Sequence, residues 1–371
     1  MTFYKKYKQV CTSVTAKVLY FTVRFSLSFI IAAVLMSCDK NNDENNLAAL
    51  KDTYSYNPNF ARDTSITIQV AEGWDLFTGG AYHYGPSFII NADSTIDTWC
   101  AANGEANGYY HYWDVIEYKK FGADKIILEK GVALTPTSGS ADSLSVCDPS
   151  VIKWQGYYYM AYTATNNSSS GGMYNGVFFC RSLNPKGPWE KWNGIDWGGK
   201  PQPAIKTNEY IWGYGEPSML VLNDTLYVYY SKNGKTYPTM LSKADISADF
   251  NPAALKTVGE VLDRADAKGD KLVVRYCDSL KIFVAVQSIL RMTADSYILL
   301  WKSDDGVTFR PMQKITANLE PYLHNCGISG DEIGHIDISK KQYIGYGYGN
   351  GWANWSLKVH TIEIKDNRSL E

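Results

Sequence analysis

Residues 212–231 read "WGYGEPSMLVLNDTLYVYYS", a stretch with the composition of two strands around a tight turn. Both halves are rich in Val, Leu and Tyr, and the pair Asn223-Asp224 between them is typical of a β-hairpin. Pro217 is expected to hold the preceding Glu216 in extended backbone. Glu216 therefore stands at the start of a strand, either as a solvated edge residue or as a carboxylate placed for chemistry.

The same unit, a strand, a polar turn and a second strand, recurs along the chain at residues 87–102, 150–164, 218–231, 272–288 and 335–349. Three of these units open on the same motif: Gly85-Pro86-Ser87, Asp148-Pro149-Ser150 and Glu216-Pro217-Ser218, with prolines 63 and 68 residues apart. An X-Pro-Ser tripeptide arises easily by chance, but even spacing before one repeated unit favours a true repeat. About five units of roughly 65 residues predict an all-β, five-bladed β-propeller.

Topology then gives a reason for the carboxylates at these motifs. The first strand of each propeller blade lines the central channel, so residues at the start of those strands converge on one funnel. Asp148 and Glu216 are expected to meet there, although 68 positions separate them in the sequence. We expect one domain over residues 61–371, without an internal boundary.

The composition limits the classes of partner. The chain of 371 residues has a formal net charge of −2 and no basic stripe, which argues against nucleic acid. Aromatic residues make up 14%, with 28 Tyr and 11 Trp. Such rings suit a β-rich core, and they also suit a surface that stacks on sugar rings.

The N-terminal region has the features of a targeting segment. A basic start precedes the apolar run at residues 25–36, which is too short to span a bilayer. Leu35-Met36-Ser37-Cys38 resembles a bacterial lipobox, which implies removal of residues 1–37 and lipidation of Cys38. Residues 38–60 are then a flexible tether. We expect a lipid-anchored protein of the cell envelope, at the outer membrane or cell surface, that meets the membrane only through this anchor; the alternative is a plain signal peptide or an uncleaved anchor with a chance cysteine.

The remaining cysteines show no metal or redox spacing. They number five and lack a C-x-x-C pair, so we expect most of them to be small buried hydrophobic residues: Cys100, Cys147, Cys180, Cys277 and Cys326.

The motifs together resemble glycoside hydrolase family 43 and its five-bladed relatives. The resemblance rests on Asp148-Pro-Ser-Val with "WQGYYYMAYTA", on Glu216-Pro-Ser with "DTLYVYYS", and on Gly334-His335, which is expected to open the last blade. It implies hydrolysis of glycosidic bonds in oligo- or polysaccharides without a required cofactor. Glu216 is then the general acid and Asp148 the residue that sets its pKa and orientation. His335 is then the residue at the axis of the central channel, and a structural calcium ion or a water molecule would lie near it.

One position departs from that pattern. The family's general base is a blade-one aspartate before proline, and here that position is Gly85. The base role is left to Asp148 or to Asp331, which lies in the polar stretch "HNCGISGDEIGHID" at residues 324–337. His335 of the same stretch is an alternative acid. If no base exists, the site only binds sugar.

Four further residues are expected to contact substrate. His83 and Tyr84 stand at the blade-one rim, where His83 could replace the base electrostatically or donate to a hydroxyl. Arg275 lies in a channel-strand pattern, where it binds substrate or pairs with a carboxylate of the site. Trp212 lies four residues before Glu216, the first residue of the blade-three motif.

The sequence leaves two questions open: the role of the Trp- and Gly-rich connection at residues 192–205, and the function of the protein as a whole. The connection is either a sugar-stacking rim or packing between blades. The protein is a glycoside hydrolase, or a non-catalytic carbohydrate-binding propeller that has lost its base, or a propeller that serves as a protein-interaction platform.

Overall fold

The fold is described from a computed structural model that covers residues 64–79, 81–169, 172–206, 213–232, 238–262 and 271–368. The predicted signal peptide, the lipidation site Cys38 and the tether lie outside these residues, as does Trp212. Among the described residues, no helix combines the length and the apolar character needed to cross a membrane.

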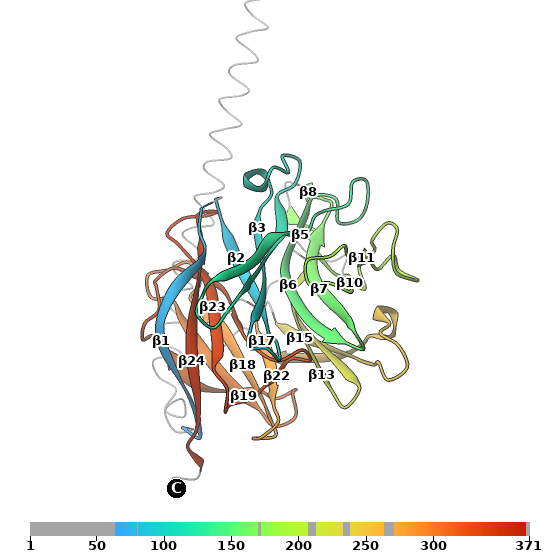
Figure 1. The fold of residues 1–371 in the computed structure, drawn as a ribbon. Coiled ribbons are helices and arrows are strands. Elements are labelled where there is room, and N and C mark those ends of the chain that lie inside the picture. The colour runs from blue at the N-terminus through green and yellow to red at the C-terminus, as the bar shows by residue number, and fades with distance from the viewer. Residues whose placement is uncertain are drawn as a thin grey trace, which may run out of the picture. The chain divides into compact units, whose positions relative to one another are not determined.

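Five antiparallel sheets form the blades of a β-propeller, which confirms the predicted fold (Figure 1). Blade one contains β2 (His83–Ile90), β3 (Ile96–Asn103), β4 (Asp114–Phe121) and β5 (Ile127–Leu134). Blade two contains β6 (Ser145–Trp154), β7 (Tyr157–Thr165), β10 (Gly176–Ser182) and β11 (Glu190–Lys191). Blade three contains β13 (Tyr214–Leu222), β14 (Thr225–Lys232), β15 (Thr239–Asp245) and β16 (Lys256–Leu262).

Blade four contains β17 (Val273–Cys277), β18 (Ile282–Ile289), β19 (Tyr297–Ser303) and β20 (Arg310–Ile315). Blade five contains β21 (Leu323–Ile328), β23 (Gln342–Tyr348), β24 (Ser356–Asp366) and β1 (Ile66–Phe77). The smaller elements are β12 (Ile205–Lys206), β22 (His335–Ile336), the hairpin β8 (Ser168–Ser169) and β9 (Gly172–Met173), and the 3₁₀ turns η1 (Glu105–Asn107) and η2 (Pro252–Ala254).

The two ends of the described chain close the ring. The first strand, β1, pairs antiparallel with the last strand, β24, so blade five combines residues from both ends. Figure 1 shows these two strands side by side, blue against red. Backbone hydrogen bonds between the two ends of the described chain therefore hold blade five together.

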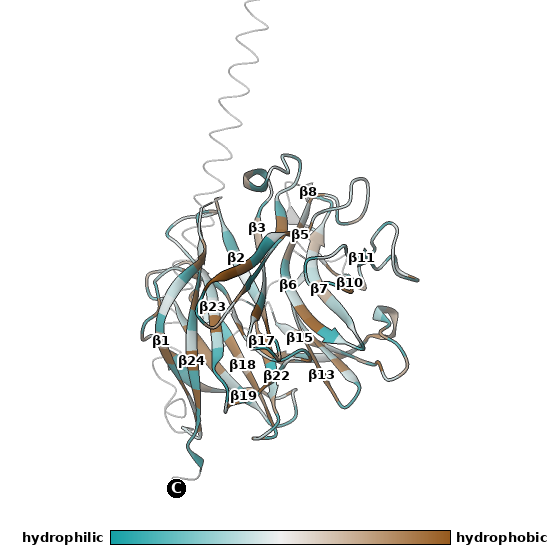
Figure 2. Ribbon diagram, viewed as in Figure 1, coloured by the Kyte–Doolittle hydropathy of each residue, from teal (hydrophilic) through white to brown (hydrophobic). Residues whose placement is uncertain are grey.

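Apolar side chains fill the space between neighbouring blades. One cluster joins blades two and three around Phe179 and Val228, and another joins blades four and five around Val286 and Ile344. Figure 2 shows hydrophobic residues concentrated on the strands and hydrophilic residues on the connections. The five cysteines of this region are free and buried, as expected for small core residues.

The serines of the X-Pro-Ser motifs link successive blades. The hydroxyl of Ser87 accepts a hydrogen bond from the backbone N–H of Val151 at 3.0 Å, and Ser150 accepts one from Met219 at 2.8 Å. Ser218 accepts from Val274 of blade four at 3.0 Å. All three hydroxyls are buried, so each inner strand is held in register with the next by one side chain.

Blade five uses a glycine where blades one to three use this serine. Gly327 lies two residues after Asn325, as Ser87 lies two after Gly85. A Cβ atom on Gly327 would stand 2.1 Å from the carbonyl oxygen of Pro86, a contact that no side chain can make. The inner strands of blades five and one therefore approach too closely for a serine.

The last blade differs from its prediction. It opens at Leu323 with β21, and residues 329–334 form a loop that leads into the short β22, which pairs in parallel with β17 of blade four. We call residues 329–336 the closing segment. Its carbonyl groups accept backbone hydrogen bonds from the inner strands of four blades in turn. The donors are Ile90 to Gly330 at 2.8 Å, Lys153 to Glu332 at 2.5 Å, Val221 to Ile333 at 2.9 Å and Tyr276 to Gly334 at 3.2 Å.

All four donors lie near the ends of their inner strands, or just beyond, on the side opposite to the X-Pro-Ser motifs. The closing segment therefore spans the far end of the channel, and the motif side is the end left for a funnel. Its glycines are needed for this close approach: a Cβ atom on Gly334 would lie 2.9 Å from Cβ of Leu220.

The serine links predict a stability defect. Replacing Ser150 with Ala would leave the buried N–H of Met219 without its acceptor, which costs about 1–3 kcal/mol. We expect chemical denaturation to show a loss of unfolding free energy in that range for Ser150→Ala. Ser247→Ala, at an exposed serine, is the matched control and should stay within error of the parent protein; equal stabilities of the two variants would contradict the linking role.

Candidate functional site

The residue before each motif proline has an unusual backbone. Gly85, Asp148 and Glu216 have φ values of +62°, +49° and +55°, and Asn325 of blade five has +37°. The expectation of extended backbone at Glu216 is therefore wrong. At all four positions the ladder with the second strand shows a register shift, and a β-bulge of this kind re-aims a side chain. A left-handed backbone at residues with side chains is strained, and such strain concentrates at functional sites.

Blade four supplies a lysine at the equivalent position. Val274 bonds to the serine of the preceding blade as Val151 and Met219 do, and the residue three positions before it is Lys271. The five equivalent residues are hereafter the entrance ring: Gly85, Asp148, Glu216, Lys271 and Asn325. Lys271 has neither proline nor serine after it, so the sequence pattern could not reveal it.

The two predicted carboxylates lie together. The side-chain amide of Asn325 donates to Asp148 Oδ1 at 2.9 Å and to Glu216 Oε1 at 3.5 Å. Asp148 and Asn325 are buried, whereas Glu216 is half-buried and keeps contact with solvent. Asn325 Oδ1 is buried without a hydrogen-bond partner, so an acceptor remains available beside both carboxylates.

The contacts of Asn325 also limit how far apart the carboxylates are. The sum of its two distances is an upper bound on the separation of Asp148 Oδ1 from Glu216 Oε1. Asp148 is thus close enough to act on Glu216 electrostatically.

Neighbouring strands fix the orientation of Glu216. The Ser231 hydroxyl of β14 donates to Glu216 Oε2 at 2.6 Å. The backbone N–H of Glu216 donates to Thr163 Oγ1 of β7 at 2.7 Å, so blade two holds the bulge of blade three.

Lys271 places a buried positive charge behind the carboxylates. Its ammonium group donates to the carbonyl oxygens of Pro149 at 2.8 Å and of Asp148 at 3.4 Å. Burial lowers the pKa of Lys271 to about 8, and the charges of Asp148 and Glu216 oppose that decrease. The lysine therefore fastens the backbone of the blade-two motif and is sensitive to the charge of the site.

Gly85 leaves space that Asp148 occupies. A Cβ atom built on Gly85 would lie 3.1 Å from Asp148 Oδ1. The carboxylate of blade two thus lies beside the blade-one position, where the resemblance to family 43 led us to expect a base.

A second buried carboxylate lies behind Asp148. Asp114, the first residue of β4, accepts hydrogen bonds from the Tyr82 hydroxyl at 2.6 Å and from the Ser145 hydroxyl. Burial raises the pKa of Asp114 to about 6, against those two hydrogen bonds, and the charge of Asp148 adds to the increase. No sequence signal marks Asp114 beyond its place after the aromatic stretch 109–113.

Tyr84, expected at the blade-one rim, lies next to the entrance ring. Its ring stacks on His324 of blade five with centroids 4.8 Å apart, and Trp355 contacts both rings at 5.7 and 4.5 Å. Burial raises the pKa of the Tyr84 hydroxyl well above its usual range, and the charges of Asp114 and Asp148 act in the same direction. Tyr84 is therefore a hydroxyl donor on an aromatic wall next to the entrance ring.

His83 does not join this group. Its Nε2 lies 3.3 Å from Glu117 Oε2, and its ring packs against Phe77 of β1 with centroids 5.2 Å apart. The contact with Phe77 packs blade one against β1 of blade five. Because His83 is engaged in these contacts, the structure does not support it as a substitute base.

Arg275 lies farther along the channel than predicted for a partner of Asp148 or Glu216. It is buried, and its Nη1 donates to the carbonyl oxygens of Val274 at 2.9 Å and Met219 at 3.5 Å. Burial lowers the pKa of Arg275 to about 10, and the charged group that opposes this decrease is Asp331. Arg275 thus belongs with the closing segment.

Asp331 and His335 are at the closed end of the channel. Asp331 Oδ1 accepts the backbone N–H of His335 at 2.8 Å, and His335 Nε2 lies 2.6 Å from the carbonyl oxygen of Val221. Val221 is five residues beyond Glu216 on β13, which corresponds to about 16 Å of strand. The structure therefore separates both residues from Glu216, in contrast to the base role expected for Asp331 and the alternative acid role of His335.

The predicted calcium ion lacks support at His335. Its Nε2 is taken by Val221, and its Nδ1 lies 2.7 Å from Asp278 Oδ2. Across the described ranges, no group of three or more His, Cys, Asp or Glu side chains is arranged to hold a metal ion.

Comparison with known proteins agrees with this architecture. No protein-family model matches the chain, and no curated protein matches it. Among solved structures it is similar to Zg3597, a family 117 glycoside hydrolase of the marine bacterium Zobellia galactanivorans, with 15% identity over 83% of this chain and 92% of that one and a TM-score of 0.55.

Two further structures have the same fold. One is the α-L-arabinofuranosidase PaAbf62A of Podospora anserina in complex with cellotriose, at 12% identity, 80% and 95% coverage and a TM-score of 0.51. The other is CoXyl43, a family 43 β-xylosidase/α-arabinofuranosidase from a compost metagenome in complex with xylotriose, at 14% identity, 80% and 95% coverage and a TM-score of 0.54. At these identities the likeness establishes the fold.

The buried carboxyl group of Asp114 predicts a pH dependence of stability. Its pKa is about 6 in the folded protein, above the ordinary 3.8, so its contribution is complete below pH 4 and is lost as the pH rises through 6. A shift of this size corresponds to about 2–3 kcal/mol. Between pH 4 and 7 we expect the parent protein to lose about that much unfolding free energy relative to Asp114→Asn, measured by urea denaturation; parallel pH profiles would contradict it.

Proposed function

We propose that this protein is a glycoside hydrolase that acts on oligo- or polysaccharides, with Glu216 as general acid. The observation that carries the proposal is the shared hydrogen-bond donor of Asp148 and Glu216, two carboxylates from different blades at the open end of the channel. The propeller fold shared with three glycoside hydrolases supports it.

The chemistry follows from the different exposure of the two carboxyl groups. Glycoside cleavage needs an acid that protonates the leaving oxygen, and two carboxyl groups that share a site retain a proton more readily than one alone. Asp148 is buried, so it stays an electrostatic and orienting partner, whereas half-buried Glu216 can reach a substrate. Ser231 donates to Oε2 of Glu216 and the Asn325 amide to Oε1, so both oxygens of the proposed acid are oriented by neighbouring blades.

The site also offers groups to hold a sugar. Tyr84 is partly exposed and stacks on the buried His324 next to Asn325. A sugar ring presents C–H groups to an aromatic ring and hydroxyls to its polar end, so Tyr84 is the proposed sugar contact.

A second candidate function rests on Gly85. Without a carboxylate at that position, activation of water depends on a group outside the usual pattern. A non-catalytic carbohydrate-binding propeller is therefore the alternative. It predicts saccharide binding at the entrance ring without turnover.

Substitution of Glu216 tests the catalytic proposal. General acid catalysis matters most when the leaving group is poor, so Glu216→Gln should lower kcat on oligosaccharides by about 10²-fold or more. The same variant should be much less impaired on a 2,4-dinitrophenyl glycoside, whose leaving group needs no proton. Glu105→Gln, at an exposed glutamate, is the control.

The outcomes separate the candidates. Unimpaired hydrolysis by Glu216→Gln would exclude Glu216 as the acid. Binding of saccharides by the parent protein, with no hydrolysis of any substrate in the panel, would favour the carbohydrate-binding alternative.

We also propose a lipid-anchored location in the cell envelope, supported by the lipobox-like Leu35-Met36-Ser37-Cys38. In the native host, Cys38→Ser should move the protein from the membrane fraction to the soluble fraction of the envelope, because it removes the acceptor thiol. Immunoblots of separated fractions measure this shift. An unchanged membrane fraction would point to an uncleaved anchor.

A further inference from the structure

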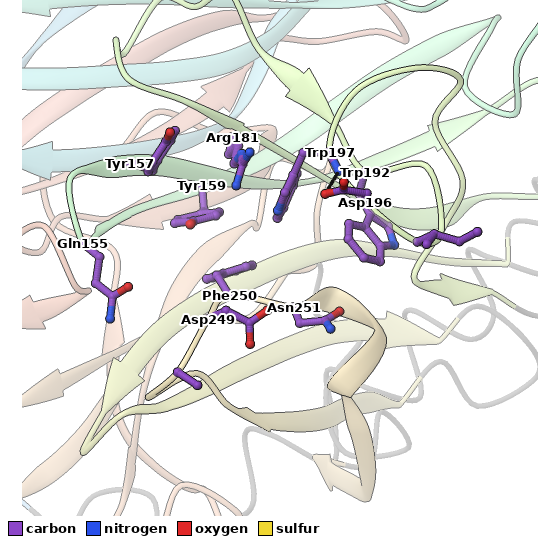
Figure 3. Close-up of a pocket in the computed structure, with 12 residues that line it drawn as sticks. Gln155, Tyr157, Tyr159, Arg181, Trp192, Asp196, Trp197, Asp249, Phe250 and Asn251 are labelled. Carbon is purple, nitrogen blue, oxygen red and sulfur yellow. Dashed lines mark hydrogen bonds between the residues drawn. The ribbon is translucent and has the colours of Figure 1, made fainter.

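A cavity lies between blades two and three, at the opposite ends of their strands from the entrance ring. It is lined by the β6–β7 turn, by residues 192–197 after β11 and by residues 248–251 after β15, and its volume is about 350 Å³ (Figure 3). This volume is at the lower end of the roughly 300–1,000 Å³ of small-ligand pockets. One side of the cavity is formed by the Trp-rich connection. From the sequence, this connection was expected to be either a sugar-stacking rim or packing between blades.

The floor of the cavity is aromatic and rigid. Tyr159 and Phe250 stack with centroids 3.8 Å apart, and both are buried. Trp197 packs against Tyr159 at 5.7 Å and against Trp192 at 5.4 Å. Trp197 and Tyr157 are only half-buried, so parts of these two rings remain open to a ligand.

A fixed arginine lies between the two accessible rings. The guanidinium group of Arg181 is 4.9 Å from the centroid of Tyr157 and 5.0 Å from that of Trp197. Its Nε donates to Glu190 Oε2 at 2.9 Å, which orients the group. Figure 3 shows Arg181, Tyr157 and Trp197 along one side of the cavity.

Carboxylate and amide groups lie across from the arginine. Asp249 is exposed, and the structure describes no hydrogen bond or ion pair for its carboxylate. Asn251 uses Oδ1 to cap Ala253 at 2.9 Å, which leaves its Nδ2 hydrogens for a ligand. Asp196 accepts the backbone N–H of Trp197 at 2.7 Å through one oxygen, and its other oxygen is unused in the described contacts.

We propose that this cavity, hereafter the blade 2/3 cavity, is a second carbohydrate-binding site that takes one neutral sugar residue of a glycan. Half-open aromatic rings beside planar donors and acceptors suit a pyranose, which has C–H faces and a rim of hydroxyls. Arg181 is already neutralised by Glu190, so Asp196 and Asp249 give the cavity a negative balance. That balance disfavours uronic acids and sulfated sugars.

The site is independent of Glu216 because the two lie at opposite ends of the blades. It would hold a polymer against the protein on a face away from the funnel, whether or not the entrance ring cleaves it. Its test therefore reads binding at Trp197 rather than hydrolysis.

The experiment follows the indole N–H resonance of Trp197 by NMR in the Glu216→Gln protein, with Trp197→Phe used to assign that resonance. The probes are xylotriose, cellotriose, mannotriose and maltotriose, and trigalacturonic acid is the anionic counterpart. We expect at least one neutral trisaccharide to shift the resonance in a saturable way, and trigalacturonic acid to bind at least tenfold more weakly.

Asp249→Ala is the matched variant, since Asp249 has no described structural contact to lose. It should weaken the neutral trisaccharide about tenfold at Trp197, whereas Asp304→Ala, at an exposed aspartate of blade four, should leave the affinity unchanged. Equal affinity in Asp249→Ala and the parent, no shift with any neutral probe, or a preference for trigalacturonic acid would overturn the proposal. None of these results bears on Glu216, whose role is read from hydrolysis.

Discussion

Three buried serine hydroxyls set the geometry on which the rest of the structure depends. Each accepts the backbone N–H of the next inner strand, so Ser87, Ser150 and Ser218 fix the register of blades one to four. A shift of one residue would turn every inner side chain to the other face of its strand. The hydrogen bonds thereby determine which residue of each blade stands at the open end of the channel.

The entrance ring then brings together charged side chains from different blades. Two carboxylates share the amide of Asn325, and a buried lysine lies behind them. Gly85 completes the ring without a side chain, and Asp148 leans into the space above it. The chemistry available to this propeller is therefore set by one missing carboxylate as much as by the two that are present.

The entrance ring and the closing segment are both rich in polar residues, but they have different roles. Asp331, His335 and Arg275 satisfy backbone groups where the closing segment meets the inner strands, so their side chains serve the closed end. A loop rich in His, Asp and Gly is compatible with catalysis and with channel closure alike. The backbone hydrogen bonds that this loop accepts from Ile90, Lys153, Val221 and Tyr276 identify its role as channel closure.

The sequence by itself determined the five-bladed propeller and the meeting of Asp148 with Glu216, because repeated X-Pro-Ser motifs carry both the period of the blades and the start of each inner strand. It could not identify Lys271 or Asn325, since blades four and five reach the same position without proline or serine, nor Asp114, which starts a third strand. The tertiary structure identified these residues, and it also showed which end of the channel the closing segment spans. The physical reason is that the ring positions are equivalent through hydrogen bonds between blades, and such bonds join residues that share no local pattern.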